Sequence, residues 1–423
     1  MKRRPTRASR GRIRTLLLVA VLAVTVGVFV QGLRNRMGVD RAPVTYGVEN
    51  CTLLTAPAGP EDVAIDDRTG VAYVSALNRR DPGAQGDLWM LDLAAEQPEL
   101  SQESMHGSIQ DSLQESMQEF VRLERDGPVD FRPHGLSLLR IDDTLRLFVV
   151  NHPQGRHTIE VFAIEDGRAR HLTTIGSDAL ISPNDVAAVD ETRFYVSNDH
   201  GTTGGVSRLM EDLLGLNMAN VLYFDGERFV EAISGLSYAN GVTLAQDGAQ
   251  LVVAEVFARG ITFYDREPMS GRVAPHLLVE LDSGVDNLTV SADGAIWIAG
   301  HPRLLDFAAH ARDASARSAT EVFRVERSAQ GTRFDRVLSD DGALLPGGSV
   351  AAAWRDRLLV SGVFEPRMLR CVLDPEFAAG PPLAPGGAVG PLPDGPVPAA
   401  GPAPAGAGRS APVIEPVLTM DGV

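Results

Sequence analysis

Six segments of the chain share one pattern of hydrophobic and polar positions. Each begins with small or polar residues, continues with apolar residues at alternate positions, passes through a turn and ends in a second apolar run. The segments start at Glu61, Pro133, Pro183, Ala239, Val285 and Gly347. A hydrophobic period of two predicts strands, and turn sequences such as QDG and ADG between two such runs predict hairpins. The pattern therefore predicts six units built on paired strands.

The spacing of these units predicts an all-β fold, a six-bladed β-propeller with four-stranded blades. Successive units start about 46 to 72 residues apart, which suits a four-stranded blade with its loops. The units and their flanks span residues 48–373, and a body of this length can bury a large core.

Two stretches within this body break the pattern. The first, SQESMHGSIQDSLQESMQEFVRLERDG from Ser101, is polar and predicts an exposed insertion, with room for a short helix. The second, RLMEDLLGLNM from Arg208, has apolar residues at helical spacing. It predicts a helix that either caps one face of the propeller or packs as an ordinary amphipathic helix.

Residues 1–34 combine a basic cluster with an apolar run. Lys and Arg residues crowd positions 2–14, and residues 15–30 carry no charge. This pattern predicts a membrane signal anchor. Because no small-residue cleavage motif follows the apolar run, we favour an uncleaved anchor over a cleaved signal, which would give a secreted protein. The basic flank should stay in the cytoplasm, so the rest of the chain would be exported to the periplasm or the cell exterior.

The C-terminal residues 375–423 are rich in Pro, Gly and Ala. Such a composition buries too little apolar area to offset the entropy of ordering. We therefore predict a disordered tail.

The sequence holds two cysteines, Cys51 and Cys371, at the two ends of the strand-rich body. In an exported chain an even pair favours a disulfide, which would link the ends of the ring. The alternative is two unrelated buried thiols.

The formal net charge of −16 argues against nucleic acid as a partner. A phosphate-binding surface needs clustered Lys and Arg, and here the basic cluster is confined to the first residues. An acidic body is consistent with the binding of cations.

The starts of the six units carry the candidate chemistry. In a propeller the innermost strands line a central channel, so equivalent positions on them converge at one end of it. Converging carboxylates resist burial unless a cation compensates their charge. An all-oxygen set suits calcium first and magnesium second, and no His/Cys cluster has the spacing of a zinc site. The converging positions are Glu61, Asp62, His134, Asn184, Asp185, Asn240, Asp286, Asn287 and Ser349. Taken singly, each Asn or Asp here is also a common turn former.

Nine segments, in order, resemble the paraoxonase/arylesterase family. They are FRPHGLSLL, LFVVNHP, TIEVF, PNDVAAV, FYVSNDH, ANGVTL, VAEVFARGITFY, VDNLTV and GSVAAAW. The resemblance covers about residues 48–373 and is specific as a set, although PNDV or ANGV alone would be weak. It implies a six-bladed propeller with two calcium ions in its channel. The arginine-rich anchor, the polar insertion and the long tail depart from the family pattern, which leaves the substrate range open.

The resemblance also implies a role for individual residues. The catalytic calcium would be held by Glu61, Asn184, Asn240, Asp286 and Asn287. The structural calcium would be held by Asp62, Asp185 and the backbone carbonyl of Leu136. The family's histidine pair falls on His134 and His152, and its disulfide on Cys51 and Cys371.

The function implied is calcium-dependent hydrolysis of lactones first, aryl esters second and organophosphates as slow side substrates. The metal would polarise the carbonyl, His134 would take a proton from the attacking water, and His152 would orient His134. Asp286 is the alternative base. His200 and His301, at strand ends, either line the pocket or serve the structure. No G-x-S-x-G motif is present, which disfavours a serine hydrolase.

Two other functions stay open. One is a sugar-lactone hydrolase of the gluconolactonase type, which lacks the PHG/NHP histidine pair. The other is a non-catalytic propeller whose metals are structural and whose face binds a partner.

Overall fold

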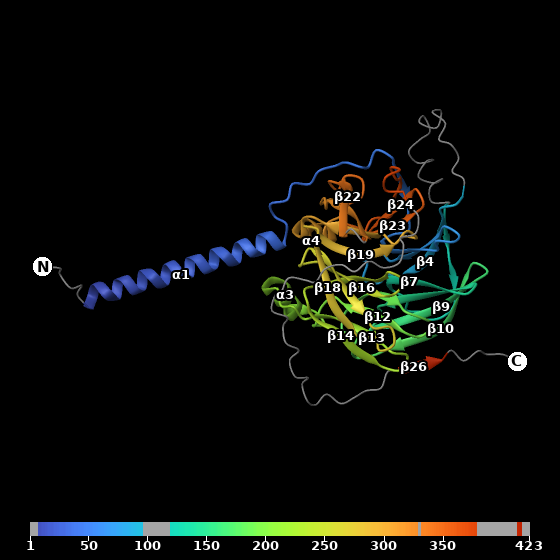
Figure 1. Ribbon diagram of the computed structural model, residues 1–423, viewed down its shortest axis with the longest axis horizontal. Helices are drawn as coiled ribbons and strands as arrows, with labels where there is room; N and C mark the ends of the chain where they lie inside the picture. Colours follow the sequence, from blue (N-terminus) through green and yellow to red (C-terminus); the bar gives the residue numbers. More distant parts are fainter. Residues whose placement is uncertain (1–6, 96–118, 329–330, 379–412, 417–423) are drawn as a thin grey trace.

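The structure is a computed structural model that describes residues 7–95, 119–328, 331–378 and 413–416. Within these residues, six antiparallel sheets surround a common axis and form the predicted six-bladed propeller (Figure 1). The inner strands β2, β7, β11, β15, β19 and β23 lie side by side around this axis, and β23 returns to β2. The prediction of six four-stranded blades is confirmed.

The first three blades run outward from the axis in chain order. Blade 1 consists of β2 (Pro60–Ile65), β3 (Val71–Ala76), β4 (Asp87–Asp92) and β5 (Phe120–Arg122). Blade 2 consists of β7 (Pro133–Ile141), β8 (Thr144–Asn151), β9 (Thr158–Glu165) and β10 (Arg168–Gly176). Blade 3 consists of β11 (Pro183–Ala188), β12 (Phe194–Asn198), β13 (Ala219–Phe224) and β14 (Phe229–Leu236).

The remaining blades follow the same plan until the ring closes. Blade 4 consists of β15 (Ala239–Ala245), β16 (Gln250–Glu255), β17 (Gly260–Arg266) and β18 (Val273–Glu280). Blade 5 consists of β19 (Gly284–Val290), β20 (Ile296–His301), β21 (Thr320–Ser328) and β22 (Gly331–Asp340). Blade 6 consists of β23 (Gly348–Trp354), β24 (Arg357–Gly362), β25 (Arg367–Val372) and, as its outer strand, β1 (Cys51–Thr55).

Apolar side chains fill the space between neighbouring blades. Ala72 and Val74 of blade 1, for example, are fully buried in one cluster with Trp354 and Leu359 of blade 6. The inner strands are buried at their starts because they are covered on both faces there, and all residues of β11 and β23 are buried. Strand β7 is only half-buried over most of its length. The core therefore holds each inner strand, and the polar residues at its start, in a fixed position.

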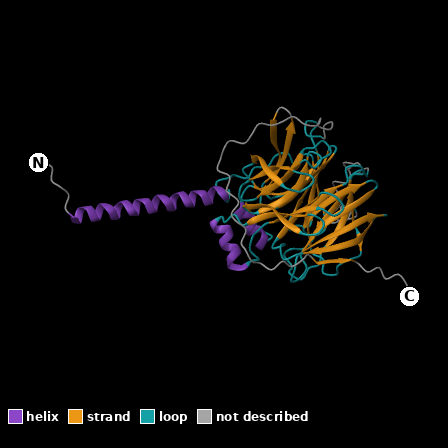
Figure 2. Ribbon diagram, turned by 60° about the horizontal axis from the view of Figure 1, so that its bottom comes forward, coloured by secondary structure: helices purple, strands orange, loops and turns teal. Residues whose placement is uncertain are grey.

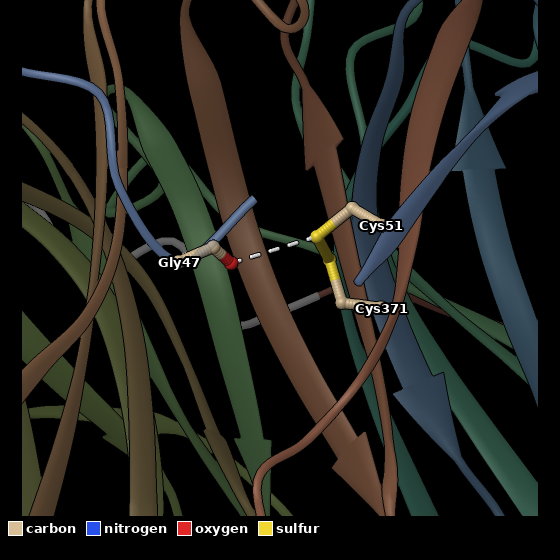
Figure 3. Close-up of a disulfide and its surroundings, with 3 residues drawn as sticks. All are labelled: Gly47, Cys51 and Cys371. Atoms are coloured by element: carbon tan, nitrogen blue, oxygen red, sulfur yellow. Dashed lines mark hydrogen bonds between the residues drawn. A yellow bond between two sulfur atoms is a disulfide. The ribbon is translucent and has the colours of Figure 1, made fainter. Parts of the chain in front are cut away.

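The ring is closed by strand β1, which comes from the N-terminal side of the chain. It pairs with β25 over its whole length, and Cys51 lies opposite Cys371. The two cysteines form a disulfide across a sequence separation of 320 residues (Figure 3). The predicted disulfide is confirmed, and the alternative of two separate thiols is wrong.

Three described helices stand outside the blades, and the two views show them on one side of the molecule (Figures 1 and 2). Helix α1 (Arg7–Arg36) projects away from the propeller, and its segment Leu16–Arg36 has a mean hydropathy of 2.5 and no buried part. That segment is long and apolar enough to span a membrane or to act as a signal sequence.

Helix α3 (Gly205–Leu214) confirms the predicted helix, and α4 (Leu304–Arg312) follows β20. Gly215, directly after helix α3, has a left-handed backbone conformation, which commonly ends a helix. Its apolar side chains Val206, Leu209 and Leu213 are exposed.

Two predicted regions fall largely outside the described residues. The polar insertion is described only from residue 119 onward, where β5 and the short β6 (Glu124–Arg125) follow. Of the predicted tail, residues 379–412 and 417–423 lie outside the described part, whereas β26 (Val413–Pro416) pairs with the outer edge of β10. The disorder of the tail stays a prediction.

Candidate metal centre and histidine chain

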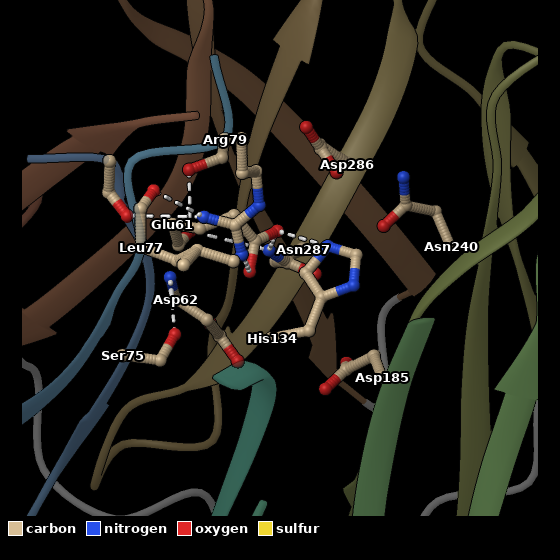
Figure 4. Close-up of polar contacts among 12 residues, drawn as sticks. Glu61, Asp62, Ser75, Leu77, Arg79, His134, Asp185, Asn240, Asp286 and Asn287 are labelled. Atoms are coloured by element: carbon tan, nitrogen blue, oxygen red, sulfur yellow. Dashed lines mark hydrogen bonds and ion pairs between the residues drawn. The ribbon is translucent and has the colours of Figure 1, made fainter. Parts of the chain in front are cut away.

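Every inner strand has an irregularity at the position of the candidate site. Its pairing with the second strand of the blade shifts register at residues 60–62, 133–136, 183–186, 239–242, 285–288 and 348–350. A bulge of this kind frees a residue from the ladder and redirects its side chain. The same irregularity occurs in all six blades, and Figure 4 shows that polar side chains beside it in blades 1 to 5 point into a common space.

Two glycines allow the inner strands to approach at this end. A Cβ at Gly135 would lie 2.5 Å from Cα of Asp185, and a Cβ at Gly241 would lie 2.7 Å from the carbonyl oxygen of Asp286. Only glycine fits these contacts without movement of the next blade. The PHG and ANG sequences therefore set the spacing between the polar side chains that flank them.

Four buried oxygens at the centre have no hydrogen-bond partner among the described residues. They are Glu61 Oε2, Asn184 Oδ1, Asn240 Oδ1 and Asn287 Oδ1, on side chains that are between 1 and 5 % exposed. The nearest cation to Glu61 Oε2 is Arg79 Nη2, at 3.7 Å. Because buried polar atoms are almost always satisfied, four such acceptors on four inner strands indicate a missing electropositive partner.

Asp62 and Asp185 differ from this group because their oxygens are satisfied by the backbone of the next blade. Asp62 Oδ2 accepts the N–H of Leu136 at 2.6 Å, and Asp185 Oδ2 accepts the N–H of Val242 at 2.8 Å. These two carboxylates therefore join blade 1 to blade 2 and blade 3 to blade 4. Leu136 takes part through its N–H, and the predicted role of its carbonyl stays a prediction.

Burial disfavours the charged form of these carboxyl groups unless a cation lies beside them. Burial, together with the Asp185 and Glu61 charges, raises the pKa of Asp62 well above its usual range. Burial likewise raises the pKa of Asp185 and Asp286. For Glu61, burial acts in the same direction, but His134 and Arg79 outweigh it and hold its pKa at about 2. A divalent cation would relieve this repulsion.

The donor set fits a hard cation. Among the described residues no three His, Cys, Asp or Glu side chains are arranged to hold a metal, but three of the five residues expected around the catalytic ion are asparagines. The four unpartnered atoms of these residues are oxygens, and calcium accepts a mixed carboxylate and carboxamide set of this kind. The residues present therefore fit the expected ion.

The predicted histidine pair is part of a longer chain of rings. His134 Nε2 lies 3.4 Å from Glu61 Oε1, and its Nδ1 lies 3.0 Å from His152 Nε2. His152 Nδ1 in turn lies 2.9 Å from Nδ1 of His157. The structure thus brings His134 and His152 together as expected. It adds His157, which the sequence analysis missed because one histidine in a loop carries no pattern.

Another residue that the sequence analysis missed is Arg79. It lies beside Glu61, and it donates to the backbone carbonyls of Gly59 and Pro133 (Figure 4). Burial lowers the pKa of Arg79, and the Glu61 charge opposes this. No repeated motif pointed to it, because it follows the second strand of blade 1 alone.

The two other histidines have different surroundings. His301 lies at the centre, where its Nε2 is 2.9 Å from Asp286 Oδ2 and its ring stacks on Phe307. His200 joins helix α3 to blade 3, with its nitrogens 2.8 Å from Asp199 Oδ1 and Asp212 Oδ1. His301 therefore belongs to the site, and His200 serves the structure.

Known proteins resemble this chain over most of its length. The model of the family described as Arylesterase matches residues 55–373. Serum paraoxonase/arylesterase 2 of Gallus gallus is 30% identical over 376 residues, which cover 86% of this chain and 100% of that protein. Serum paraoxonase/arylesterase 1 of Rattus norvegicus is 30% identical over 352 residues, which cover 80% of this chain and 93% of that protein. Among solved structures, a luciferin-regenerating enzyme is similar, with a TM-score of 0.47 and 12% identity over 78% of this chain and 98% of that chain.

Proposed function

The chain belongs to the arylesterase family, and from that premise we propose that it hydrolyses lactones and aryl esters with the aid of calcium. Lactones are the proposed main substrates, and organophosphates are slow side substrates. The observation that carries this proposal is the group of four buried oxygens without partners, on Glu61, Asn184, Asn240 and Asn287.

Two ions are proposed, each with its own residues. Glu61, Asn184, Asn240, Asp286 and Asn287 would hold the catalytic calcium, and Asp62, Asp185 and the carbonyl of Leu136 would hold the structural one. When bound, the catalytic ion would supply Lewis-acid stabilisation of the negative charge that develops on the carbonyl oxygen of the substrate.

We assign to His134 the role of the general base that accepts the proton of the attacking water. Its Nε2 faces Glu61 at the centre, whereas its Nδ1 is bonded to His152. Nε2 is therefore the nitrogen that would accept the proton. Asp286 is the alternative base, although its Oδ2 is already in contact with His301.

Metal removal combined with a substrate panel tests this function. The purified full chain should hydrolyse acyl-homoserine, aliphatic or aromatic lactones, and a chelator should abolish the activity until calcium is restored. Complete removal of calcium should also lower the melting temperature, because an ion that binds the native state stabilises that state. Full activity in metal-free protein would contradict the mechanism.

The panel also separates the alternatives. A gluconolactonase-like enzyme would prefer sugar lactones, whereas a non-catalytic propeller would lose stability with its calcium and hydrolyse none of the compounds.

A further inference from the structure

A chain of three imidazole rings runs from the centre toward the surface. The nitrogen distances are 3.0 Å between His134 and His152 and 2.9 Å between His152 and His157. The ring centroids are 5.1 and 4.8 Å apart, and the second pair meets edge to face. His157 lies in the loop before β9 and is partly exposed. Among the described residues, His152 is the hydrogen-bond partner of its side chain.

We propose that His157 is a positioning residue whose Nδ1 accepts the Nδ1–H of His152 and thereby sets the tautomer of both inner rings. The proposal rests on the hydrolytic function assigned to the site above. In this proposal His157 acts through its hydrogen bond to His152 and does not contact the substrate.

A neutral imidazole ring carries one N–H, so one of its nitrogens donates a hydrogen bond and the other accepts one. Which nitrogen is protonated is set by the bond that the other one makes. In a chain of three rings, the direction of one hydrogen bond therefore fixes the direction of the next.

Only one of the two directions leaves His134 able to act as a base. If His157 Nδ1 accepts, His152 carries its proton on Nδ1 and presents a bare Nε2 to His134. His134 then donates from Nδ1 and presents a bare Nε2 to the centre. Glu61 Oε1 lies 3.4 Å from that nitrogen and is also an acceptor, so this direction requires that the proposed calcium hold the Glu61 carboxylate. In the opposite direction His134 would carry its proton on Nε2, where it would donate to Glu61 and could not take a proton from water.

The surroundings favour neutral rings at His152 and His157. Burial lowers the pKa of His152 well below 6.5, and His134 and His157 add to this effect. Burial also lowers the pKa of His157, with the Asp199 carboxylate opposing it and Arg208 supporting it. The exposed side of His157 leaves its Nε2–H to solvent, which satisfies a donor at low cost.

Two variants of the full chain separate this role from a purely structural one. Asn places an oxygen at the position of Nδ1, the same number of bonds from Cα, so His157→Asn keeps the acceptor. His157→Leu removes it. We expect His157→Leu to lose about 100-fold in kcat, the lower end of what a general base contributes, with KM, calcium content and melting temperature unchanged. We expect His157→Asn to keep most of its kcat.

Either of two results would overturn the proposal. One is that His157→Leu keeps the kcat of the wild type, and the other is that His157→Asn loses as much activity as His157→Leu.

A second measurement does not depend on activity. Nitrogen NMR of ¹⁵N-histidine-labelled protein reports which ring nitrogen of His152 is protonated. We expect Nδ1–H in the wild type and in His157→Asn. A wild-type His152 protonated on Nε2 would refute the proposal.

If the wild type hydrolyses no lactone, the proposed function fails, and the nitrogen spectra of the rings still decide the role of His157. If His157→Leu does not fold, the wild type and His157→Asn decide it.

Discussion

Two kinds of buried oxygen meet at the inner ends of the blades. Among the described residues, the side-chain oxygens of Asn184, Asn240 and Asn287 have no hydrogen-bond partner, whereas those of Asp62 and Asp185 accept backbone N–H groups of the next blade. The first kind is available to an ion that must also bind a substrate. The second kind already ties strands together, which suits an ion that stabilises the fold.

Substitution at Asn240 and Asp185 should separate these roles. Asn240→Ala removes one proposed neutral ligand and no side-chain bond between blades, so it should cut turnover strongly while the melting temperature stays close to that of the wild type. Asp185→Ala removes the acceptor for Val242 and Val186. Loss of one partner at a buried charged site costs about 3–5 kcal/mol, so this variant should melt early. Thermal unfolding and lactone hydrolysis measured on both variants would expose a reversed assignment.

His134→Gln tests the identity of the general base. The variant should fold and bind calcium as the wild type does, because a glutamine amide can keep the contact that the ring makes with Glu61 of blade 1. It should lose lactone turnover, because an amide cannot accept the proton of water. Kinetics, calcium content and melting temperature provide the check. A variant that retains full activity would make Asp286 the leading candidate for the base.

The residues of the site differ in how far the sequence could predict them. Glu61, Asn184, Asn240 and Asp286 occupy equivalent places in a repeat, so register alone brings them together. His157 and Arg79 lie in loops or at strand ends that have no counterpart in other blades. Their positions depend on three-dimensional packing, which a repeat pattern does not contain.

At the scale of elements, helix α3 is attached to the propeller by few contacts. His200 binds Asp212 of the helix and Asp199 of the blade, and Glu211 accepts hydrogen bonds from Gly201 and Thr202. The apolar residues of α3 face outward, so these polar contacts, together with those that Arg208 makes with Asp199 and Ser182, hold it in place. Helical spacing predicted the helix from sequence, but not which of its faces would be exposed.

The attachment of α3 should depend on pH through His200. Burial would lower the pKa of His200, but hydrogen bonds to Asp199 and Asp212 outweigh it and raise the pKa to about 9. Since this value lies above that of an unfolded histidine, the stabilisation is fully present below about pH 6.5 and is lost as pH rises through 9. It amounts to at most about 3 kcal/mol. Melting curves from pH 6 to 10 should show a steeper loss in the wild type than in His200→Gln, and parallel curves would exclude this role.

At the scale of the whole molecule, the apolar helix α1 stands apart from the propeller (Figure 2). The sequence predicted both parts, because the basic apolar segment and the repeats have unlike patterns. It could not predict the side from which the helix leaves, since that depends on packing of the segment that follows. In the structure Arg41 forms ion pairs with Asp282 and Glu321, and Arg303 donates to the carbonyls of Val39 and Arg41.

Deletion of residues 1–34 tests the proposed membrane anchor. We expect the full chain in the membrane fraction and the truncated chain in solution, with lactone hydrolysis retained, because the contacts of Arg41 remain. Fractionation and an activity assay provide the measurement. A truncated chain that stays with the membrane would show that another surface holds it there.

The closure of blade 6 by β1 also sets the order in which the molecule can be completed. Its pairing partner β25 is made some 320 residues later. At a synthesis rate of roughly 5–20 residues per second, β1 waits about 16 to 64 seconds for that partner. Blades 1 to 5 have all four of their strands before then, whereas blade 6 cannot be complete until β25 emerges. A newly made chain in which Cys51 and Cys371 are bonded has therefore already received every strand of its six blades.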